Sequence, residues 1–225
     1  MKRPQRLPSS QTLASFGQNW SISPQMDPAF ALFDTAIGSC AIVWGESGIV
    51  GVGLPSESQA STRAQITKRF PTAAEAPPSP GIKQAIDDIQ ALLHGEKRDL
   101  TAAKLDLTGI PDFQRKVYAA ARAIPPGQTL TYGEISAKLN APGTARAVGQ
   151  ALGANPFPII VPCHRILASG GKAGGFSAPG GLDTKMRLLN IERAGAPLEP
   201  SLFDQLPLSA PPRRPRGDPS SFRRR

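Results

Sequence analysis

The spacing of apolar and polar residues divides the chain into two halves of different character. Short apolar runs dominate the beginning of the first half, and glycine-containing segments at 38–39 and 45–48 separate them as hairpin turns. This pattern predicts three β-strands, over residues 30–37, 40–44 and 49–54.

Helical spacing follows the third apolar run. We predict a helix over 58–70, a proline-rich loop over 71–80 and a second helix whose apolar residues recur until Leu93. Gly95 is placed to end that helix, and residues 104–107 are a candidate strand. The first half therefore reads as a small sheet with helices.

The second half contains closely spaced helices. An apolar stripe predicts a helix that begins at Pro111 and ends before the Pro-Pro-Gly segment 125–127. Two shorter helices, over 132–139 and 144–153, flank the turn at 140–143. This is the helix-turn-helix arrangement, which many small helical proteins share, so the pattern alone assigns no function.

The net charge of +9 is concentrated at the two ends of the chain. Residues 1–26 and residues 197–225 each carry +3 in segments rich in Pro, Ser or Gln, a composition that buries little apolar surface. We therefore expect disordered tails there, a first lobe over 27–108 and a second over 109–196. The tails would add salt-sensitive attraction to DNA phosphates, but charge alone does not establish a DNA-binding protein.

The cysteine count and the hydropathy pattern narrow the class of protein. Two cysteines in 225 residues provide neither a disulfide framework nor a zinc-binding spacing. No apolar stretch reaches the length of a membrane span, and the N-terminal residues contain no apolar signal region. We expect a cytoplasmic protein that has no metal and does not act at a membrane.

One tetrapeptide carries the strongest chemical signal. Pro162-Cys163-His164-Arg165 follows an apolar run, and at average composition it arises by chance in fewer than about one chain per thousand of this length. A thiol is a good nucleophile as the thiolate, and an adjacent imidazole can take its proton. Cys163 is therefore the candidate nucleophile and His164 the candidate base.

The residues around this tetrapeptide extend the signal. They are Tyr132, Ala145-Arg146-Ala147-Val148-Gly149, Asn155-Pro156, Gly174-Gly175-Phe176-Ser177, Gly180-Gly181, Lys185, Leu188-Leu189 and Glu192. With this set the chain resembles the O6-alkylguanine-DNA alkyltransferase family. The resemblance is close over 111–192, looser over 30–107 and absent from both ends.

The resemblance implies an α+β fold and a DNA repair activity. A small ribonuclease-H-like lobe of sheet and helices would pack on a mostly helical lobe with a winged-helix-like helix-turn-helix. The protein would act as a monomer on double-stranded DNA, flip out O6-alkylguanine, with O4-alkylthymine as a second candidate, and transfer the alkyl group irreversibly to Cys163, once per molecule and with no cofactor. Some relatives hold zinc with two cysteines and two histidines, whereas the first lobe here offers only Cys40 and His94, so we expect no zinc.

The helix over 144–153 is the candidate DNA-facing element. Its periodicity leaves Arg146 and Gln150 exposed, with Ala147 beside them. By resemblance, this helix enters the minor groove, and Arg146 takes the place of the flipped nucleotide. Tyr132 would help to rotate the target phosphate and would donate a proton or a hydrogen bond to the guanine ring.

A histidine and a carboxylate are the candidates for activating the nucleophile. By resemblance, His164 acts on Cys163 through a bridging water. Glu192 lies on an apolar helix face, where a lone carboxylate is costly, and either His164 or Arg165 would remove that cost. The logic of catalytic triads favours His164. Asn155 is expected to hold the turn that positions the nucleophile.

The expected guanine pocket combines side chains and backbone. Pro158, Phe176 and Ser177 would line it, with backbone groups near Cys163 and Ile166 reading the edge of the base. Phe176 stands where some relatives have tyrosine, so the aromatic wall is kept and a hydroxyl is lost. Ala178-Pro179 are two extra residues relative to some relatives, and they are expected to influence the entry of bulky alkyl groups.

Three other functions fit parts of the sequence. A non-catalytic damage sensor on the same scaffold lacks the reactive cysteine that Cys163 supplies here. A cysteine hydrolase using Cys163, His164 and Glu192 needs an oxyanion hole, for which the sequence offers no candidate. A regulator that reads DNA sequence needs polar side chains on its second helix, where this chain has mostly small residues. We therefore favour the DNA repair alkyltransferase, with the damage sensor as the alternative.

Overall fold

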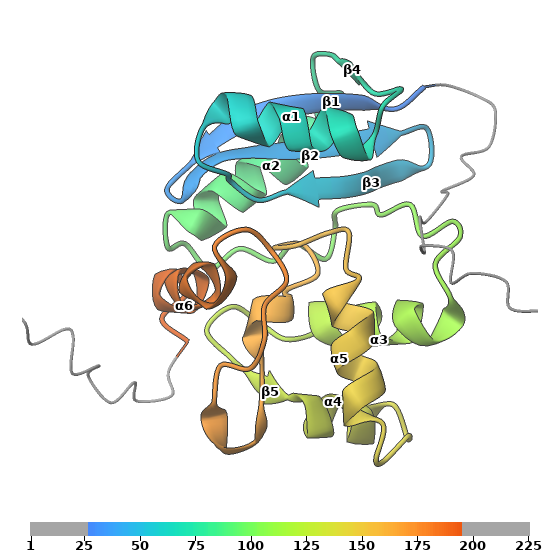
Figure 1. Cartoon of the computed structure of the whole chain (residues 1–225), viewed down its shortest axis with the longest axis vertical. Helices are drawn as coiled ribbons and strands as arrows, with labels where there is room; N and C mark the ends of the chain where they lie inside the picture. Colours follow the sequence, from blue (N-terminus) through green and yellow to red (C-terminus); the bar gives the residue numbers. More distant parts are fainter. Residues whose placement is uncertain (1–26, 195–225) are drawn as a thin grey trace, which may run out of the picture. The chain divides into compact units, whose positions relative to one another are not determined.

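The computed structural model describes residues 27–194, which Figure 1 shows from blue to red. The expected tails over 1–26 and 197–225 lie outside the described residues. Within 27–194, a four-stranded sheet, a two-stranded ribbon and six α-helices form a mixed α and β structure. None of these helices is long and apolar enough to cross a membrane.

The sheet has the strand order β3-β2-β1-β4. β1 (Ala29–Thr35) pairs antiparallel with β2 (Gly38–Gly45), and β2 pairs antiparallel with β3 (Gly48–Gly53). The short β4 (Ala74–Glu75) pairs parallel with β1. All three of the predicted strands are therefore present.

The first hairpin turn lies at Ala36-Ile37, and the prediction of a turn at 38–39 was wrong. Gly38 pairs with Thr35 as the last pair of the ladder, at a φ of +124° that favours glycine. The Thr35 Oγ1 accepts the Ile37 N–H at 3.3 Å and donates to the Gly38 carbonyl at 2.7 Å. Glycine here marks the first residue of the return strand.

Alternate residues of the strands face opposite layers. On one face, Phe30, Ala41 and Val43 pack with Ile66 of α1 (Gln59–Arg69). The other face packs into the main core, to which α2 (Pro80–Leu93) contributes its apolar stripe. Figure 1 shows α1 and α2 on opposite sides of the sheet.

Two short features differ from the sequence prediction. The expected loop over 71–80 contains β4, and the expected strand over 104–107 is reduced to one parallel bridge between Ile49 and Leu105. Two hydrogen bonds of 2.8 Å hold that bridge, from the Ile49 N–H to Lys104 O and from the Asp106 N–H to Ile49 O. Elements this short produce no periodic pattern.

The second half is mostly helical, as its pattern predicts. Its elements in chain order are α3 (Asp112–Arg122), β5 (Leu130–Thr131), α4 (Tyr132–Lys138), α5 (Ala145–Gly153), the 3₁₀ turn η1 (Cys163–Arg165), β6 (Ile166–Leu167), η2 (Ser169–Gly171) and α6 (Gly181–Ile191). A capping box between Thr131 and Glu134 starts α4. β5 and β6 form a parallel ribbon, which connects the start of α4 to the segment that follows the Pro-Cys-His-Arg motif.

The two halves share one hydrophobic core. Residues of the sheet and α2 belong to the same buried cluster as residues of α3, α5 and the segment 157–161. Polar contacts cross the same boundary: the Val52 N–H donates to Pro156 O at 2.9 Å, and the Arg187 guanidinium of α6 donates to the carbonyls of Ala36 and Ile37. The segment before Cys163 is therefore anchored to the sheet.

Candidate active site

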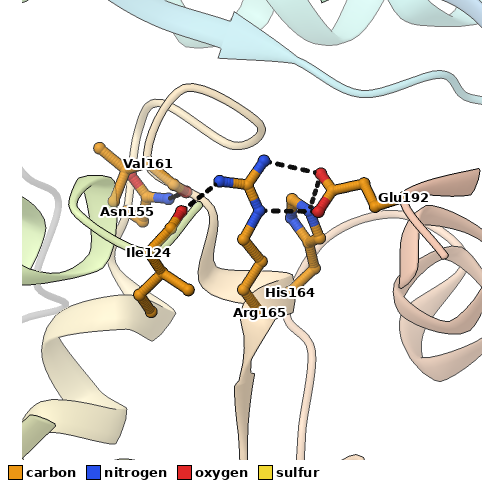
Figure 2. A network of polar contacts seen from close by, with 6 residues as sticks. All are labelled: Ile124, Asn155, Val161, His164, Arg165 and Glu192. Carbon is orange, nitrogen blue, oxygen red and sulfur yellow. Dashed lines mark hydrogen bonds and ion pairs between the residues drawn. The ribbon is translucent and has the colours of Figure 1, made fainter. Parts of the chain in front are cut away.

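A tight loop brings Cys163 to its position. The Asn155 side chain donates to Val161 O and accepts from the Phe157 N–H, both at 2.9 Å, so one amide closes the loop from both ends; Figure 2 shows the bond to Val161. Ile159 within the loop has a φ of +74°, an unfavourable value for a branched side chain. Because Ile159 is buried, core packing maintains this conformation.

Cys163 begins the 3₁₀ turn η1 and is half-buried. It lines two neighbouring pockets. Burial raises the pKa of the Cys163 thiol, while the Asn155 side chain and the Lys185 charge act in the opposite direction. Thiolate formation here needs a base close by. By contrast Cys40 is fully buried in β2, and burial raises its pKa to about 12.

His164, Arg165 and Glu192 form a buried polar cluster (Figure 2). The Glu192 carboxylate bonds His164 Nε2 at 2.9 Å and Arg165 Nε and Nη2 at 2.8 Å each. Arg165 Nη1 donates to the Ile124 carbonyl at 2.6 Å. Glu192 therefore pairs with both of the partners between which the sequence left the choice open.

The ionisation states of this cluster follow from burial and from the hydrogen bonds. Burial opposes ionisation of Glu192, but the hydrogen bonds from His164 and Arg165 outweigh it and lower its pKa to about 2. Burial lowers the pKa of His164 in spite of Glu192, and the charges of Arg165 and Lys185 add to that effect. Near neutral pH the imidazole is neutral and the carboxylate is charged.

These charges fix the tautomer of His164. A carboxylate only accepts hydrogen bonds, so Nε2 carries the hydrogen and donates it to Glu192. Nδ1 then holds a free lone pair, and it has no hydrogen-bond partner among residues 27–194. The His164 imidazole is therefore neutral, is oriented by Glu192, and can accept a proton at Nδ1.

Lys185 also belongs to the site, and the sequence analysis assigned it no role. Its side chain is fully buried in α6 and donates to Ile166 O at 2.6 Å. Burial lowers its pKa to about 8, against the attraction of Cys163. Lys185 lies three residues before Leu188, so the spacing that marked Glu192 as inward-facing would also have identified Lys185.

The larger of the two pockets has a volume of about 930 Å³. Six of the predicted site residues line it, namely Tyr132, Arg146, Gln150, Cys163, Phe176 and Ser177. α5 buries Val148, Ala151 and Leu152 and presents Arg146 and Gln150 to this pocket. The Tyr132 ring lies beside Gly149 and Gly174, where an added Cβ would be 3.7 and 3.3 Å from it.

The remaining predicted site residues lie apart from this pocket. Asn155 and Pro158 line the smaller pocket, of about 290 Å³. Ala147 is half-buried on α5 and is not among the lining residues. Ile166 is fully buried, its N–H donates to Cys163 O, and its carbonyl accepts from Lys185. The backbone of Ile166 therefore links Cys163 to Lys185 through two hydrogen bonds.

No group of three or more His, Cys, Asp or Glu side chains within residues 27–194 is arranged to hold a metal ion. The candidate site consists of the side chains described above. Those side chains provide a nucleophilic sulfur, an oriented base and a pocket that opens at the sulfur.

Comparison with known proteins identifies relatives over most of this structure. Residues 112–194 match the family model described as 6-O-methylguanine DNA methyltransferase, DNA binding domain. The methylated-DNA–protein-cysteine methyltransferase of Mycobacterium tuberculosis H37Rv is 45% identical over 128 residues, which are 56% of this chain and 75% of that protein. The protein of the same name from Methanothermobacter thermautotrophicus is 36% identical over 151 residues, 67% of this chain and 77% of that protein.

A solved structure shows the same arrangement. The crystal structure of Mycobacterium tuberculosis OGT in complex with DNA superposes with a TM-score of 0.60 at 35% identity. The match covers 78% of this chain and 99% of that one. It includes the sheet as well as the helical half, and so extends well beyond the 112–194 segment.

Proposed function

Since the chain belongs to the methylated-DNA–protein-cysteine methyltransferase family, we propose that it repairs double-stranded DNA by transferring an alkyl group from guanine O6 to Cys163. The observation that carries this proposal is the position of Cys163. Cys163 lines a pocket of about 930 Å³. It directly precedes a buried, neutral histidine whose Nδ1 has no hydrogen-bond partner among residues 27–194. An alkylatable sulfur, a base and space for a purine are what the reaction requires.

The proposed reaction is an in-line displacement at the alkyl carbon. The thiol proton passes to His164 Nδ1 through a bridging water, and Glu192 stabilises the imidazolium through Nε2. The sulfur bonds to the carbon as the carbon–O6 bond breaks, and that electron pair stays on guanine. The guanine ring takes up a proton, with the Tyr132 hydroxyl as the proposed donor. The His164 imidazolium then returns its proton to the Tyr132 phenolate through water. Overall, sulfur exchanges its proton for the alkyl group and guanine gains a proton.

DNA would bind across α5 and the mouth of the larger pocket. The target base cannot meet Cys163 while it is stacked in a duplex, so it must be flipped out. Arg146 and Gln150 lie on the pocket-facing side of α5, and the small residues between them allow close approach to the groove. We propose that Arg146 fills the space that the flipped base leaves, with Ala147 beside it.

The product is a thioether, which water does not hydrolyse under mild conditions. The protein would therefore act once per molecule. We further propose that it works as a monomer and without a cofactor, with O6-alkylguanine as its substrate and O4-alkylthymine as the second candidate. The strand order β3-β2-β1-β4 supports a ribonuclease-H-like first lobe over 27–108, and α4 and α5 with the β5-β6 ribbon support a winged-helix-like second lobe over 109–196. A cytoplasmic location remains part of the proposal.

Intact-mass measurement tests the proposed reaction. After incubation with duplex DNA that contains one O6-methylguanine, we expect one added methyl per chain, which peptide analysis maps to Cys163. Cys163→Ala should keep DNA binding and gain no mass, whereas the matched Cys40→Ala variant should react like the parent. Unchanged mass with lesion-specific binding would support the damage sensor instead, and transfer onto Cys40 would contradict the assignment of the nucleophile.

A further inference from the structure

The smaller pocket joins the two halves of the chain at the nucleophile. Cys163, Phe176 and Ser177 line it as well as the larger pocket, and Ala178-Pro179 continue its wall. Its far side comes from the first half of the chain, namely Val52, Gly53, Leu54, Gln65, Ile66 and Arg69. Cys163 therefore lies where the smaller pocket, built partly by α1 and β3, meets the larger pocket.

For alkyl groups longer than methyl, the geometry of the proposed reaction requires such a second space. In an in-line displacement the sulfur, the alkyl carbon and guanine O6 lie on one line, so any further atoms of the alkyl group project sideways from it. The guanine occupies the larger pocket in the proposed complex. A side group longer than methyl therefore extends into the smaller pocket, which shares Cys163 with the larger one.

The charge of the smaller pocket indicates which side groups it prefers. Apart from Cys163, Arg69 is its one ionisable lining residue, and no aspartate or glutamate lines it. Arg69 is exposed, like Lys68, and its guanidinium has no ion pair among residues 27–194. It lies 5.1 Å from the centre of the neighbouring Phe70 ring. Gln65, one helical turn before Arg69, donates to Ser56 Oγ at 2.9 Å, so its amide is oriented.

We propose that Arg69 selects O6-alkylguanines whose alkyl chain ends in a carboxylate, with the smaller pocket as the binding site of that chain. The proposal rests on the proposed function and uses the same bond changes: the sulfur–carbon bond forms, the carbon–O6 bond breaks, and the carboxylate is a spectator. A guanidinium recognises a carboxylate through charge-assisted hydrogen bonds. Arg69 acts here as a specificity residue and takes no part in the displacement.

Matched substrates and variants test this assignment. Duplexes carrying one O6-carboxymethylguanine or one O6-(3-carboxypropyl)guanine are compared with their carboxamide counterparts, which have nearly the same size and no charge. The rate constant of Cys163 alkylation is measured by intact mass for each. For at least one chain length, we expect the parent protein to prefer the carboxylate by about fivefold or more. Arg69→Gln should remove that preference, and Lys68→Gln should keep it because Lys68 is an exposed cation of the same helix outside the pocket.

The O6-methylguanine duplex separates this proposal from the proposed function. Methyl transfer should be equal in the parent protein and in Arg69→Gln, because a methyl group does not reach the smaller pocket. Equal losses of Arg69→Gln on all substrates would show that Arg69 binds the DNA backbone, and equal carboxylate and carboxamide rates in the parent would also overturn the proposal. Absence of methyl transfer in the parent would instead refute the proposed function.

Discussion

Glu192 concentrates three hydrogen bonds from two side chains on one buried carboxylate. Each donor removes part of the desolvation cost of the charge, and the charge in turn compensates the buried Arg165 guanidinium. The same carboxylate orients the imidazole next to the nucleophile. Stability and catalytic geometry therefore depend on one side chain.

Acid should destabilise this cluster in a defined pH range. Because the pKa of Glu192 is lowered from 4.5 to about 2 in the folded protein, its stabilising contribution is complete above about pH 5 and is lost as the pH falls toward 2. Between about pH 5 and pH 2.5, we expect the free energy of unfolding of the parent to fall by roughly 2 kcal/mol more than that of Glu192→Gln. Urea titrations at both pH values measure this difference.

The glutamine variant serves as the internal control, because all other carboxylates titrate in both proteins. Glu192→Gln should be less stable at neutral pH, since it leaves the Arg165 charge uncompensated. An equal decrease of the two proteins between the two pH values would show that Glu192 is not ionised in the folded state.

Residue by residue, the sequence indicates candidate residues more directly than their surroundings. Pro-Cys-His-Arg marked Cys163 and His164 as candidates, and the helical spacing marked Glu192 as inward-facing, which its burial confirms. Spacing gives the direction of a side chain and not its reach, so the choice between His164 and Arg165 stayed open. No sequence pattern marked Arg69. Its proposed selectivity follows from a pocket whose lining segments are about a hundred residues apart in the chain.

At the scale of elements, α5 depends on how the turn before it is held. The Ser136 hydroxyl donates to Ala141 O at 2.5 Å, and the Thr144 hydroxyl donates to the same carbonyl at 2.7 Å. The Tyr118 hydroxyl donates to Ala151 O at 3.1 Å from α3. These contacts fix the rotation of α5, and with it the side that carries Arg146.

Arg146→Ala should separate DNA recognition from the displacement chemistry. If Arg146 holds the space of the flipped base, the variant should react at least tenfold more slowly with an O6-methylguanine duplex. Its reaction with free O6-benzylguanine should stay within about twofold, because no base is flipped there. Alkylation of Cys163 is followed by intact mass on both substrates. Equal losses on both would contradict a role that is specific to duplex DNA.

The elements themselves were largely predictable, and the errors have a common cause. The helices α1 to α5 have apolar stripes or caps, so their presence could be read from the sequence, with ends accurate to one or two residues. The turn at Ala36-Ile37 was misplaced because Gly38 adopts its positive φ inside a strand pair. β4 and the bridge at Leu105 are set by partners that are distant in sequence, which local periodicity does not report.

For the whole molecule, the shared core makes the two halves interdependent. The residues around the 108/109 boundary separate two patterns in the sequence, yet buried side chains from both sides belong to one cluster. The described residues also lie within one compact unit. Unfolding of the sheet would therefore expose the core surface that supports α3 and α5.

A core substitution in the first half should weaken both halves. Leu92→Ala in α2 removes a side chain that is 1% exposed, which typically costs 2–5 kcal/mol. In native-state hydrogen exchange followed by mass spectrometry, we expect the protection of peptides from β2 and from α3 to fall by the same free energy. The exposed Lys116→Ala should leave both unchanged. A loss confined to the β2 peptides would show that the halves unfold separately.

The contact of Arg187 with the first hairpin has a consequence for biosynthesis. The carbonyls of Ala36 and Ile37 precede their guanidinium partner by 151 and 150 positions. A ribosome adds about 5–20 residues per second, so roughly 8–30 s pass between synthesis of the turn and synthesis of Arg187. During that interval the hairpin turn leaves the ribosome with those two carbonyls exposed to water, and they gain their Arg187 donor only once α6 has been synthesised.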